Sequence, residues 1–135
     1  YMLIYYAYSM LIYNTEKERE EIDLIKLNEG HTYGNYDVTI INPNGWIYDN
    51  GNGKDVMEQC FVFIKQSDMT VFSTLKDGVI GKGVYSEIEK ALYYDKPVFY
   101  LRQDGDMKRF LEENFDKIEL VNEGKDWRKY AKVKL

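Results

Sequence analysis

The segments GVYSEIEKAL (residues 83–92) and KPVFYL (residues 96–101) lie close together in the sequence and decide the fold. The first predicts a glycine turn that leads directly into a helix, and the second predicts a buried strand. Glu87 is expected in the first turn of that helix, where the positive end of the helix dipole favours a carboxylate. Because ligands of open α/β sheets bind at the carboxyl ends of strands, Glu87 is either a functional acid or one that only stabilises its own helix.

The apolar pattern outside this unit changes period repeatedly, as expected when strands alternate with helices. The predicted strands are residues 2–7, 37–41, 69–73, 97–101 and 117–121. The predicted helices are residues 16–27 (ended by Gly30), 55–66, 84–94, 106–114 and 125–132. Residues 44–54 and 74–83 are predicted to be loops.

This alternation predicts one α/β domain over residues 1–135. The expected architecture is a flavodoxin-like three-layer sandwich with right-handed crossovers. Its five-stranded, mostly parallel sheet is expected in the order 2-1-3-4-5. A ligand crevice is then expected where strands 1 and 3 diverge.

Composition excludes several classes of function. Hydrophobic residues make up 44% and charged residues 30% of the 135 residues, which is typical of a globular protein and not of a disordered one. The net charge of −5 argues against a nucleic-acid polymer as partner. A single cysteine, Cys60, and a single histidine, His31, argue against disulfides and against a zinc site, and His31 is expected to be a solvated loop residue.

No apolar run approaches the ~18 residues that span a bilayer, and the apolar start lacks a basic segment typical of signal peptides. We therefore expect a cytoplasmic protein that has no membrane partner, no metal and no cofactor.

The predicted crevice collects several polar and aromatic side chains. The sequence contains neither a Ser-His-Asp arrangement nor a phosphate-binding loop of the Walker type. What remains is a carboxylate with a phenol beside it: Glu87 could attack an anomeric carbon, with Tyr5 orienting it through a hydrogen bond. The turn Gly81-Lys82-Gly83 either presents N–H groups to an anion or only lets the chain turn tightly. The candidate substrate-binding residues are Tyr8, Ser9, Asn42, Trp46, Glu58, Asp77, Gly81, Lys82 and Gly83.

Two motifs carry a resemblance to a known family. The run Ile4-Tyr5-Tyr6-Ala7-Tyr8-Ser9 resembles the first strand of the nucleoside 2-deoxyribosyltransferase superfamily. The pattern Gly83-x-x-x-Glu87-Ile88-x-x-Ala91, followed by Lys96-Pro97-Val98, resembles the family's Gly-Thr-x-x-Glu-Ile-Gly-x-Ala…Gly-Lys-Pro-Val signature. With weaker similarity at residues 38–43 and 58–72, the resemblance covers roughly residues 3 to 101.

The resemblance implies an enzyme without a cofactor that exchanges or hydrolyses the N-glycosidic bond of a nucleoside or nucleotide. The superfamily includes the related deoxynucleotide N-glycosidases. Glu87 would be the nucleophile and Tyr5 would orient it. Related proteins form homodimers or larger homo-oligomers, which is the expectation here. This chain departs from the family at two acidic positions, where it has Cys60 on the helix before the third strand and Gly81 before the nucleophile.

Two alternatives remain open at the level of sequence. One is a non-catalytic nucleotide-binding or sensing module, which the missing acids would explain. The other is a flavin-binding protein of flavodoxin layout, which is disfavoured because no Ser/Thr-rich phosphate loop follows the first strand.

Overall fold

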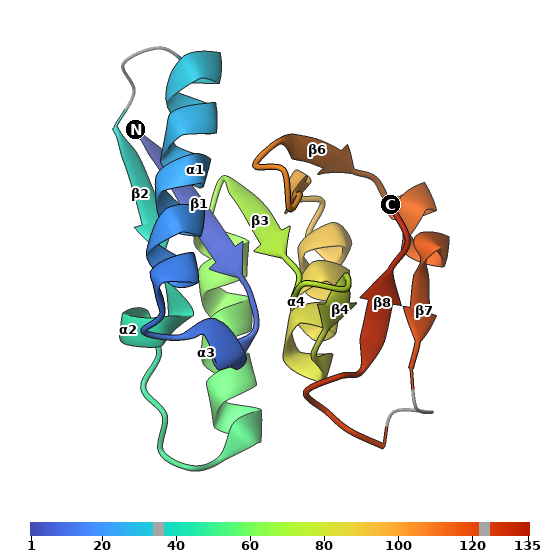
Figure 1. The fold of residues 1–135 in the computed structure, drawn as a ribbon. Coiled ribbons are helices and arrows are strands. Elements are labelled where there is room, and N and C mark those ends of the chain that lie inside the picture. Colours follow the sequence, from blue (N-terminus) through green and yellow to red (C-terminus); the bar gives the residue numbers. More distant parts are fainter. Residues whose placement is uncertain (34–36, 122–124) are drawn as a thin grey trace.

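The computed structural model describes residues 1–29, the backbone of residues 30–33, and residues 37–121 and 125–135. Its centre is a mixed α/β arrangement with a five-stranded, mostly parallel sheet in the order β2-β1-β3-β5-β6 (Figure 1). The first four strands of this order run parallel, and β6 pairs antiparallel with β5. The strands are β1 (Met2–Ala7), β2 (Val38–Ile41), β3 (Met69–Ser73), β5 (Val98–Leu101) and β6 (Met107–Phe110).

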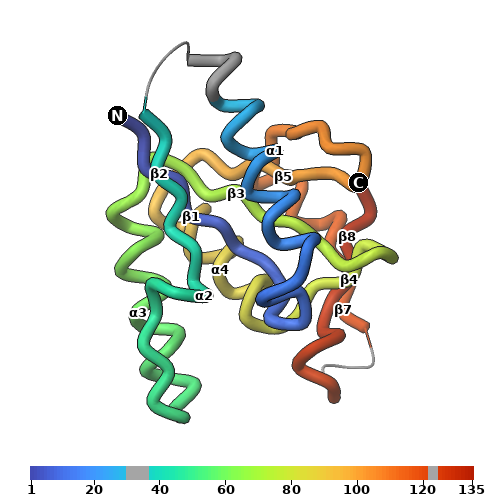
Figure 2. Tube along the Cα trace, turned by 60° about the vertical axis from the view of Figure 1, so that its left-hand side comes forward, coloured from blue at the N-terminus to red at the C-terminus, as the bar shows by residue number. Residues whose placement is uncertain are grey.

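Helices cover both faces of this sheet (Figures 1 and 2). Helix α1 (Glu16–Tyr33) lies on one face, and α3 (Gly53–Gln66) and α4 (Lys82–Tyr93) lie together on the other. Because side chains alternate along a strand, β1 supplies both cores: Tyr5 packs on the α3–α4 side and Tyr6 on the α1 side. The continuous apolar run of β1 is therefore explained by burial on both faces.

A second, three-stranded sheet extends the core beyond α4. Its order is β4-β8-β7, with both pairs antiparallel. Its buried side chains belong to the same apolar cluster as α3 and α4. The strands are β4 (Val79–Ile80), β7 (Ile118–Leu120) and β8 (Ala131–Val133). Shorter elements are the 3-10 helices η1 (Met10–Ile12) and η2 (Glu112–Lys117) and the single turn α2 (Pro43–Trp46).

The predicted order 2-1-3-4-5 is wrong at its last position. The fifth strand of the main sheet is residues 107–110, where a helix over residues 106–114 was expected, and the predicted strand at 117–121 lies in the second sheet. Gly105 adopts a φ of 87° and the Arg102 N–H donates to the Asp106 carbonyl at 2.8 Å, so the chain reverses into a hairpin. The pair Asp104-Gly105 is typical of a hairpin turn, but the helical pattern of residues 106–114 was given more weight in the prediction.

The predicted helix at residues 125–132 is also wrong. Residues 127–129 form a turn, and residues 131–133 form β8. Ala131 and Val133 are buried while Lys132 and Lys134 are not, which is the period of a strand. Pairing with β4 on one side and β7 on the other therefore overrides the local helical pattern.

Several element boundaries differ from expectation as well. Helix α1 does not end at Gly30 but continues to Tyr33, so the backbone at His31 is helical, while the prediction for its side chain lies outside the described residues. Helix α3 begins at Gly53 because Asn52 caps it, and the loop at residues 74–83 contains β4. In the described part of the chain, no helix has the length and apolar character needed to cross a membrane.

Candidate functional site

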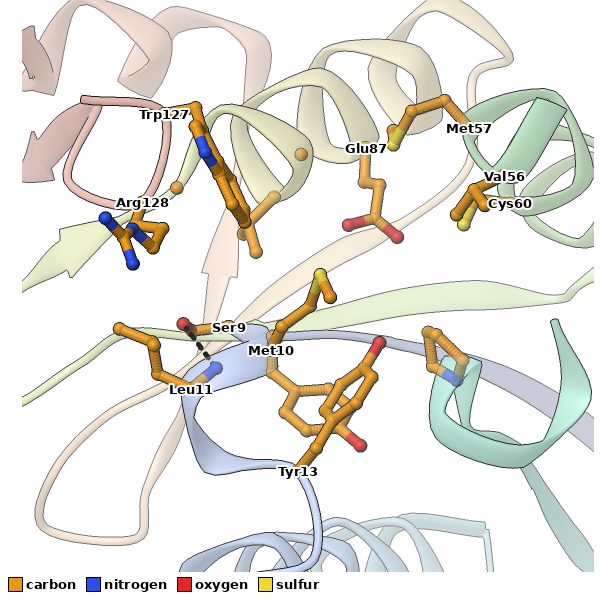
Figure 3. Close-up of a pocket in the computed structure, with 15 residues that line it drawn as sticks. Ser9, Met10, Leu11, Tyr13, Val56, Met57, Cys60, Glu87, Trp127 and Arg128 are labelled. Atoms are coloured by element: carbon orange, nitrogen blue, oxygen red, sulfur yellow. Dashed lines mark hydrogen bonds between the residues drawn. The ribbon is translucent and has the colours of Figure 1, made fainter. Parts of the chain in front are cut away.

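A pocket opens at the carboxyl end of β1, between η1, α3 and the start of α4 (Figure 3). Its lining is mostly apolar and aromatic, as is typical of small-molecule sites. It is lined by Tyr8, Ser9, Met10, Leu11, Tyr13, Pro43, Val56, Met57, Cys60, Gly81, Gly83, Val84, Glu87, Trp127 and Arg128.

The Tyr5–Glu87 pair lies at the inner side of this pocket. The Tyr5 hydroxyl donates a hydrogen bond to the Glu87 carboxyl group, joining side chains that are 82 positions apart in the sequence. Tyr5 is fully buried and Glu87 is 5% exposed, yet Glu87 still lines the pocket. The pair thus places a shielded carboxyl group with one dedicated donor in the lining of the pocket.

Glu87 does not lie in the first turn of its helix, as the sequence had suggested. Gly81 is the N-cap and Lys82 is the first helical residue, so Glu87 lies in the second turn. The helix dipole acts mainly on the first turn, and its effect on Glu87 is correspondingly small. The hydrogen bond from Tyr5 is the contact that favours the carboxylate form.

Burial dominates the titration of this pair. It raises the pKa of Glu87 to about 8, and the hydrogen bond from Tyr5 offsets only part of that rise. Burial, followed by the nearby charge of Glu87, raises the pKa of Tyr5 well above its ordinary value, so Tyr5 remains a phenol donor. Burial likewise raises the pKa of the neighbouring Cys60 thiol to about 12, which favours the protonated thiol at neutral pH.

The pKa of Glu87 predicts how stability depends on pH. Between its ordinary value of 4.5 and about 8, the folded protein keeps a proton that the unfolded chain has released. The free energy of unfolding therefore decreases as the pH rises through this interval and levels off above it. We expect Glu87→Gln, which cannot ionise, to lack this decrease, so that it gains roughly 3–5 kcal/mol on the wild type between pH 5 and 8.

Urea unfolding of both proteins from pH 5 to 9 measures this difference. Asp77→Asn is the matched control, because Asp77 is exposed. Parallel curves for wild type and Glu87→Gln would show that Glu87 is ionised in the folded protein at neutral pH.

Tyr8, another residue that lines the pocket, is held by a polar network. The Tyr8 hydroxyl hydrogen-bonds to the Glu18 carboxylate and lies 2.5 Å from Oδ1 of Asn42. Nδ2 of Asn44 donates to Oε2 of Glu18 at 2.8 Å, and the Tyr8 ring stacks on Tyr6 with centroids 3.9 Å apart. These contacts fix the position of the Tyr8 ring, which lines the pocket.

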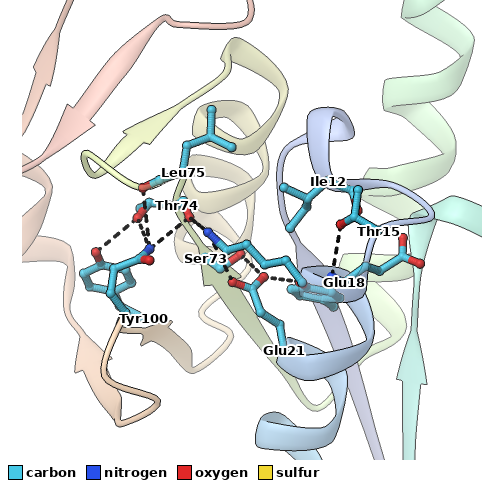
Figure 4. Close-up of polar contacts among 11 residues, drawn as sticks. Ile12, Thr15, Glu18, Glu21, Ser73, Thr74, Leu75 and Tyr100 are labelled. Atoms are coloured by element: carbon cyan, nitrogen blue, oxygen red, sulfur yellow. Dashed lines mark hydrogen bonds and ion pairs between the residues drawn. The ribbon is translucent and has the colours of Figure 1, made fainter.

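A second polar cluster lies on the α1 side of the sheet, at the end of β3 (Figure 4). Glu21 accepts hydrogen bonds from Tyr6 and, at 2.6 Å, from Ser73. Nζ of Lys17 donates to the Thr74 carbonyl at 3.2 Å and lies 4.0 Å from Glu21. Because these groups satisfy one another, the cluster anchors α1 to β3. A second pocket of about 400 Å³ opens beside it, with Lys17, Glu21 and Arg102 in its lining.

The structure brings together part of the predicted site. Five of the candidates line the pocket: Tyr8, Ser9, Gly81, Gly83 and Glu87. Tyr5 does not line it but donates a hydrogen bond to Glu87, which does. Asn42 stands behind Tyr8 and supports it without lining the pocket.

The other candidates lie outside this pocket. Glu58 is exposed, since the face of α3 toward the pocket carries residues 56, 57 and 60. Trp46 packs edge-on against Phe63, and Asp77 is exposed in the turn before β4. The Lys82 side chain is exposed, with Nζ 6.0 Å from the centroid of Tyr130.

Trp127 and Arg128 are pocket residues that sequence reasoning missed. They were assigned to a helix at residues 125–132, whereas the turn before β8 carries them to the start of α4. Only long-range strand pairing places this turn there, so no local signal could have identified it. Met57, next to the candidate Glu58, could have been found from the helical period once the pocket face of α3 was known.

Comparisons of the chain with protein-family models, curated proteins and solved structures find no significant match.

Proposed function

We propose that this protein is an enzyme of the nucleoside 2-deoxyribosyltransferase type, which cleaves or exchanges the N-glycosidic bond of a nucleoside or nucleotide. The observation that carries the proposal is the Tyr5–Glu87 hydrogen bond, at a pocket reached from the carboxyl end of β1. A carboxyl group held by a phenol in a mostly apolar pocket suits attack on an anomeric carbon. The same two residues carry the motif resemblance described above.

In the proposed reaction, an oxygen of ionised Glu87 forms a bond to the anomeric carbon while the bond from that carbon to the base nitrogen breaks. The base leaves with the electron pair of that bond and takes up a proton from solvent water. Water or a second base then attacks the same carbon and releases Glu87. Hydrolysis and transfer share the intermediate and differ only in the acceptor.

The proposal also includes a flavodoxin-like fold and an oligomeric state. Helices on both faces of a mostly parallel sheet support a flavodoxin-like fold, with the antiparallel β6 as a departure at its edge. We also propose a homodimer or larger homo-oligomer, as the family resemblance implies.

A non-catalytic nucleotide-binding module is the second candidate. One observation favours it: among the described residues that line the pocket, Glu87 is the only carboxylic acid. Glycosidic cleavage commonly uses a second acid to protonate the leaving group, and Cys60 stands on α3 where the family often has aspartate. In this alternative the pocket binds a nucleotide and leaves it intact.

Base release distinguishes the two candidates. Purified protein is incubated with each 2′-deoxynucleoside and its 5′-monophosphate, with and without a second base, and free bases are separated by chromatography. We expect release or exchange of a base, and a deoxyribosyl adduct on the peptide that contains Glu87 after rapid acid quenching. Absence of both products from every substrate would reject the enzyme and leave the binding module.

Tyr5→Phe tests the orienting role of Tyr5. The substitution keeps the ring in the core and removes the hydroxyl that donates to Glu87. We expect kcat to fall by about 10- to 100-fold. The pH at which the rate reaches half its maximum should also increase, because the hydrogen bond from Tyr5 lowers the pKa of Glu87.

Tyr6→Phe is the matched control, because the Tyr6 hydroxyl donates to Glu21 on the opposite face of the sheet. Its pH–rate profile should coincide with that of the wild type. A general loss of activity in both variants without a shift in pH would assign Tyr5 a purely structural role.

A further inference from the structure

The two ends of the pocket differ in chemistry (Figure 3). Arg128, Ser9 and Leu11 lie toward one end, whereas Val56, Met57 and Cys60 lie toward the other, beside Glu87. Trp127 projects between Arg128 and Glu87. The pocket therefore has one end that carries a cationic group and a hydroxyl group, and an apolar end that lies nearer the Glu87 carboxyl group.

Arg128 is the only cationic side chain among the described residues that line the pocket. Its side chain is 56% exposed, and Oδ1 of Asp126 lies 3.5 Å from its Nε atom. The contact with Asp126 is made through Nε, whereas the two terminal nitrogens carry the other N–H donors of the guanidinium group. Those nitrogens provide the paired donors that suit a phosphate.

The turn that carries Arg128 is attached to the element that carries Glu87. The N–H of Lys82, the first residue of α4, donates to the Trp127 carbonyl at 2.7 Å. The N–H of Tyr130 donates to the Ile80 carbonyl at 2.9 Å. A Cβ atom at Gly81 would lie 3.0 Å from the Trp127 carbonyl oxygen, so a glycine there permits this close approach. The backbone of the turn that carries Arg128 is thereby held beside the start of the helix that carries Glu87.

Ser9 adds a second polar group at the same end. Its Oγ accepts the N–H of Leu11 at 3.1 Å, which leaves its hydroxyl hydrogen available as a donor.

Building on the proposed function, we propose that the substrate is a nucleoside 5′-monophosphate, with its phosphate bound by Arg128 and Ser9. The sugar then lies beside Trp127 with its anomeric carbon toward Glu87, and the base enters the apolar end. An uncharged nucleoside would leave the Arg128 end of the pocket without a ligand group. The arrangement thus selects nucleotides over nucleosides.

Calorimetric titration of Glu87→Gln, which binds without turnover, tests this specificity. The probes are the four 2′-deoxynucleoside 5′-monophosphates and the corresponding deoxynucleosides. We expect at least one monophosphate to bind about 10- to 100-fold more tightly than its nucleoside, the range of a charged hydrogen-bonded contact. Adding Arg128→Gln should remove that preference while the affinity for the nucleoside changes less than about twofold.

Two further variants complete the test. Arg128→Lys should restore part of the preference, because it keeps the charge and loses the paired donors. Arg109→Gln removes the same charge from β6, where Arg109 lies over the Phe99 ring and outside the pocket, and should keep the full preference. Equal affinity for nucleoside and monophosphate, no binding of either, or a preference that survives Arg128→Gln would overturn the inference.

Base release is measured separately on the wild type. A monophosphate preference that depends on Arg128, without release of any base, would reject the enzymatic proposal and keep the binding inference. Release of bases at equal rates from nucleosides and monophosphates would do the opposite.

Discussion

Glu87→Ala is expected to abolish base release and exchange, with kcat lowered by on the order of 10³- to 10⁶-fold, as for loss of a catalytic nucleophile. The covalent adduct should disappear with it, because no other carboxylic acid among the described residues lines the pocket. Ligand affinity should change far less, since the remaining lining is intact. Single-turnover assays together with calorimetric titration separate these two effects.

Glu89→Ala is the matched control for that experiment. Glu89 lies two residues further along α4, is exposed and does not line the pocket. Its activity should stay within about twofold of the wild type. If Glu87→Ala retained more than a tenth of the wild-type kcat, Glu87 would not be the nucleophile.

The pH dependence of the wild-type rate follows from the same residue. Because burial raises the pKa of Glu87 to about 8, the carboxylate needed for attack is the minor form at pH 7. A rate that depends on this carboxylate should increase with pH and level off above about pH 8.

Phe110→Ala is expected to lower the free energy of unfolding by about 3–5 kcal/mol. Phe110 is 1% exposed on β6 and packs edge-on against Phe72, with ring centroids 5.3 Å apart. Phe72 in turn stacks on Tyr100 of β5. Removal of the Phe110 ring leaves a cavity at the junction of the main sheet and the α3–α4 core.

Leu111→Ala is the control for this truncation, because Leu111 is the next residue and is 43% exposed. It should cost no more than about 1 kcal/mol in urea unfolding. Residues 110 and 111 are both apolar, so the difference in unfolding free energy between the two variants shows which side chain faces the core. Similar losses in the two variants would contradict the placement of residues 107–110 as a strand of the main sheet.

Much of the candidate site was accessible from sequence because its parts lie next to strong local patterns. The apolar run at residues 2–7 predicts a strand covered on both faces, and this places Tyr5 in the core. The glycine turn and amphipathic pattern at residues 81–94 predict the helix that carries Glu87. Both are local signals whose period alone identifies the element.

The burial of the Glu87 side chain could not be predicted from the sequence in the same way. Helices usually place glutamate at the surface, and an early position in the helix suggested a carboxylate favoured by the dipole. Its burial results from the packing of α4 against α3 and β1, and that burial raises its pKa.

Local patterns thus determined the parallel core of the fold and the two residues on which the proposed chemistry rests, since burial on both faces of a strand or along one face of a helix leaves a regular period. Tertiary structure alone decided the edge of the main sheet, the second sheet, and the approach of Trp127 and Arg128 to Glu87. Those features depend on backbone pairing between distant segments, and the hydrogen bonds of β8 to β4 and β7 outweigh the helical preference of residues 125–132.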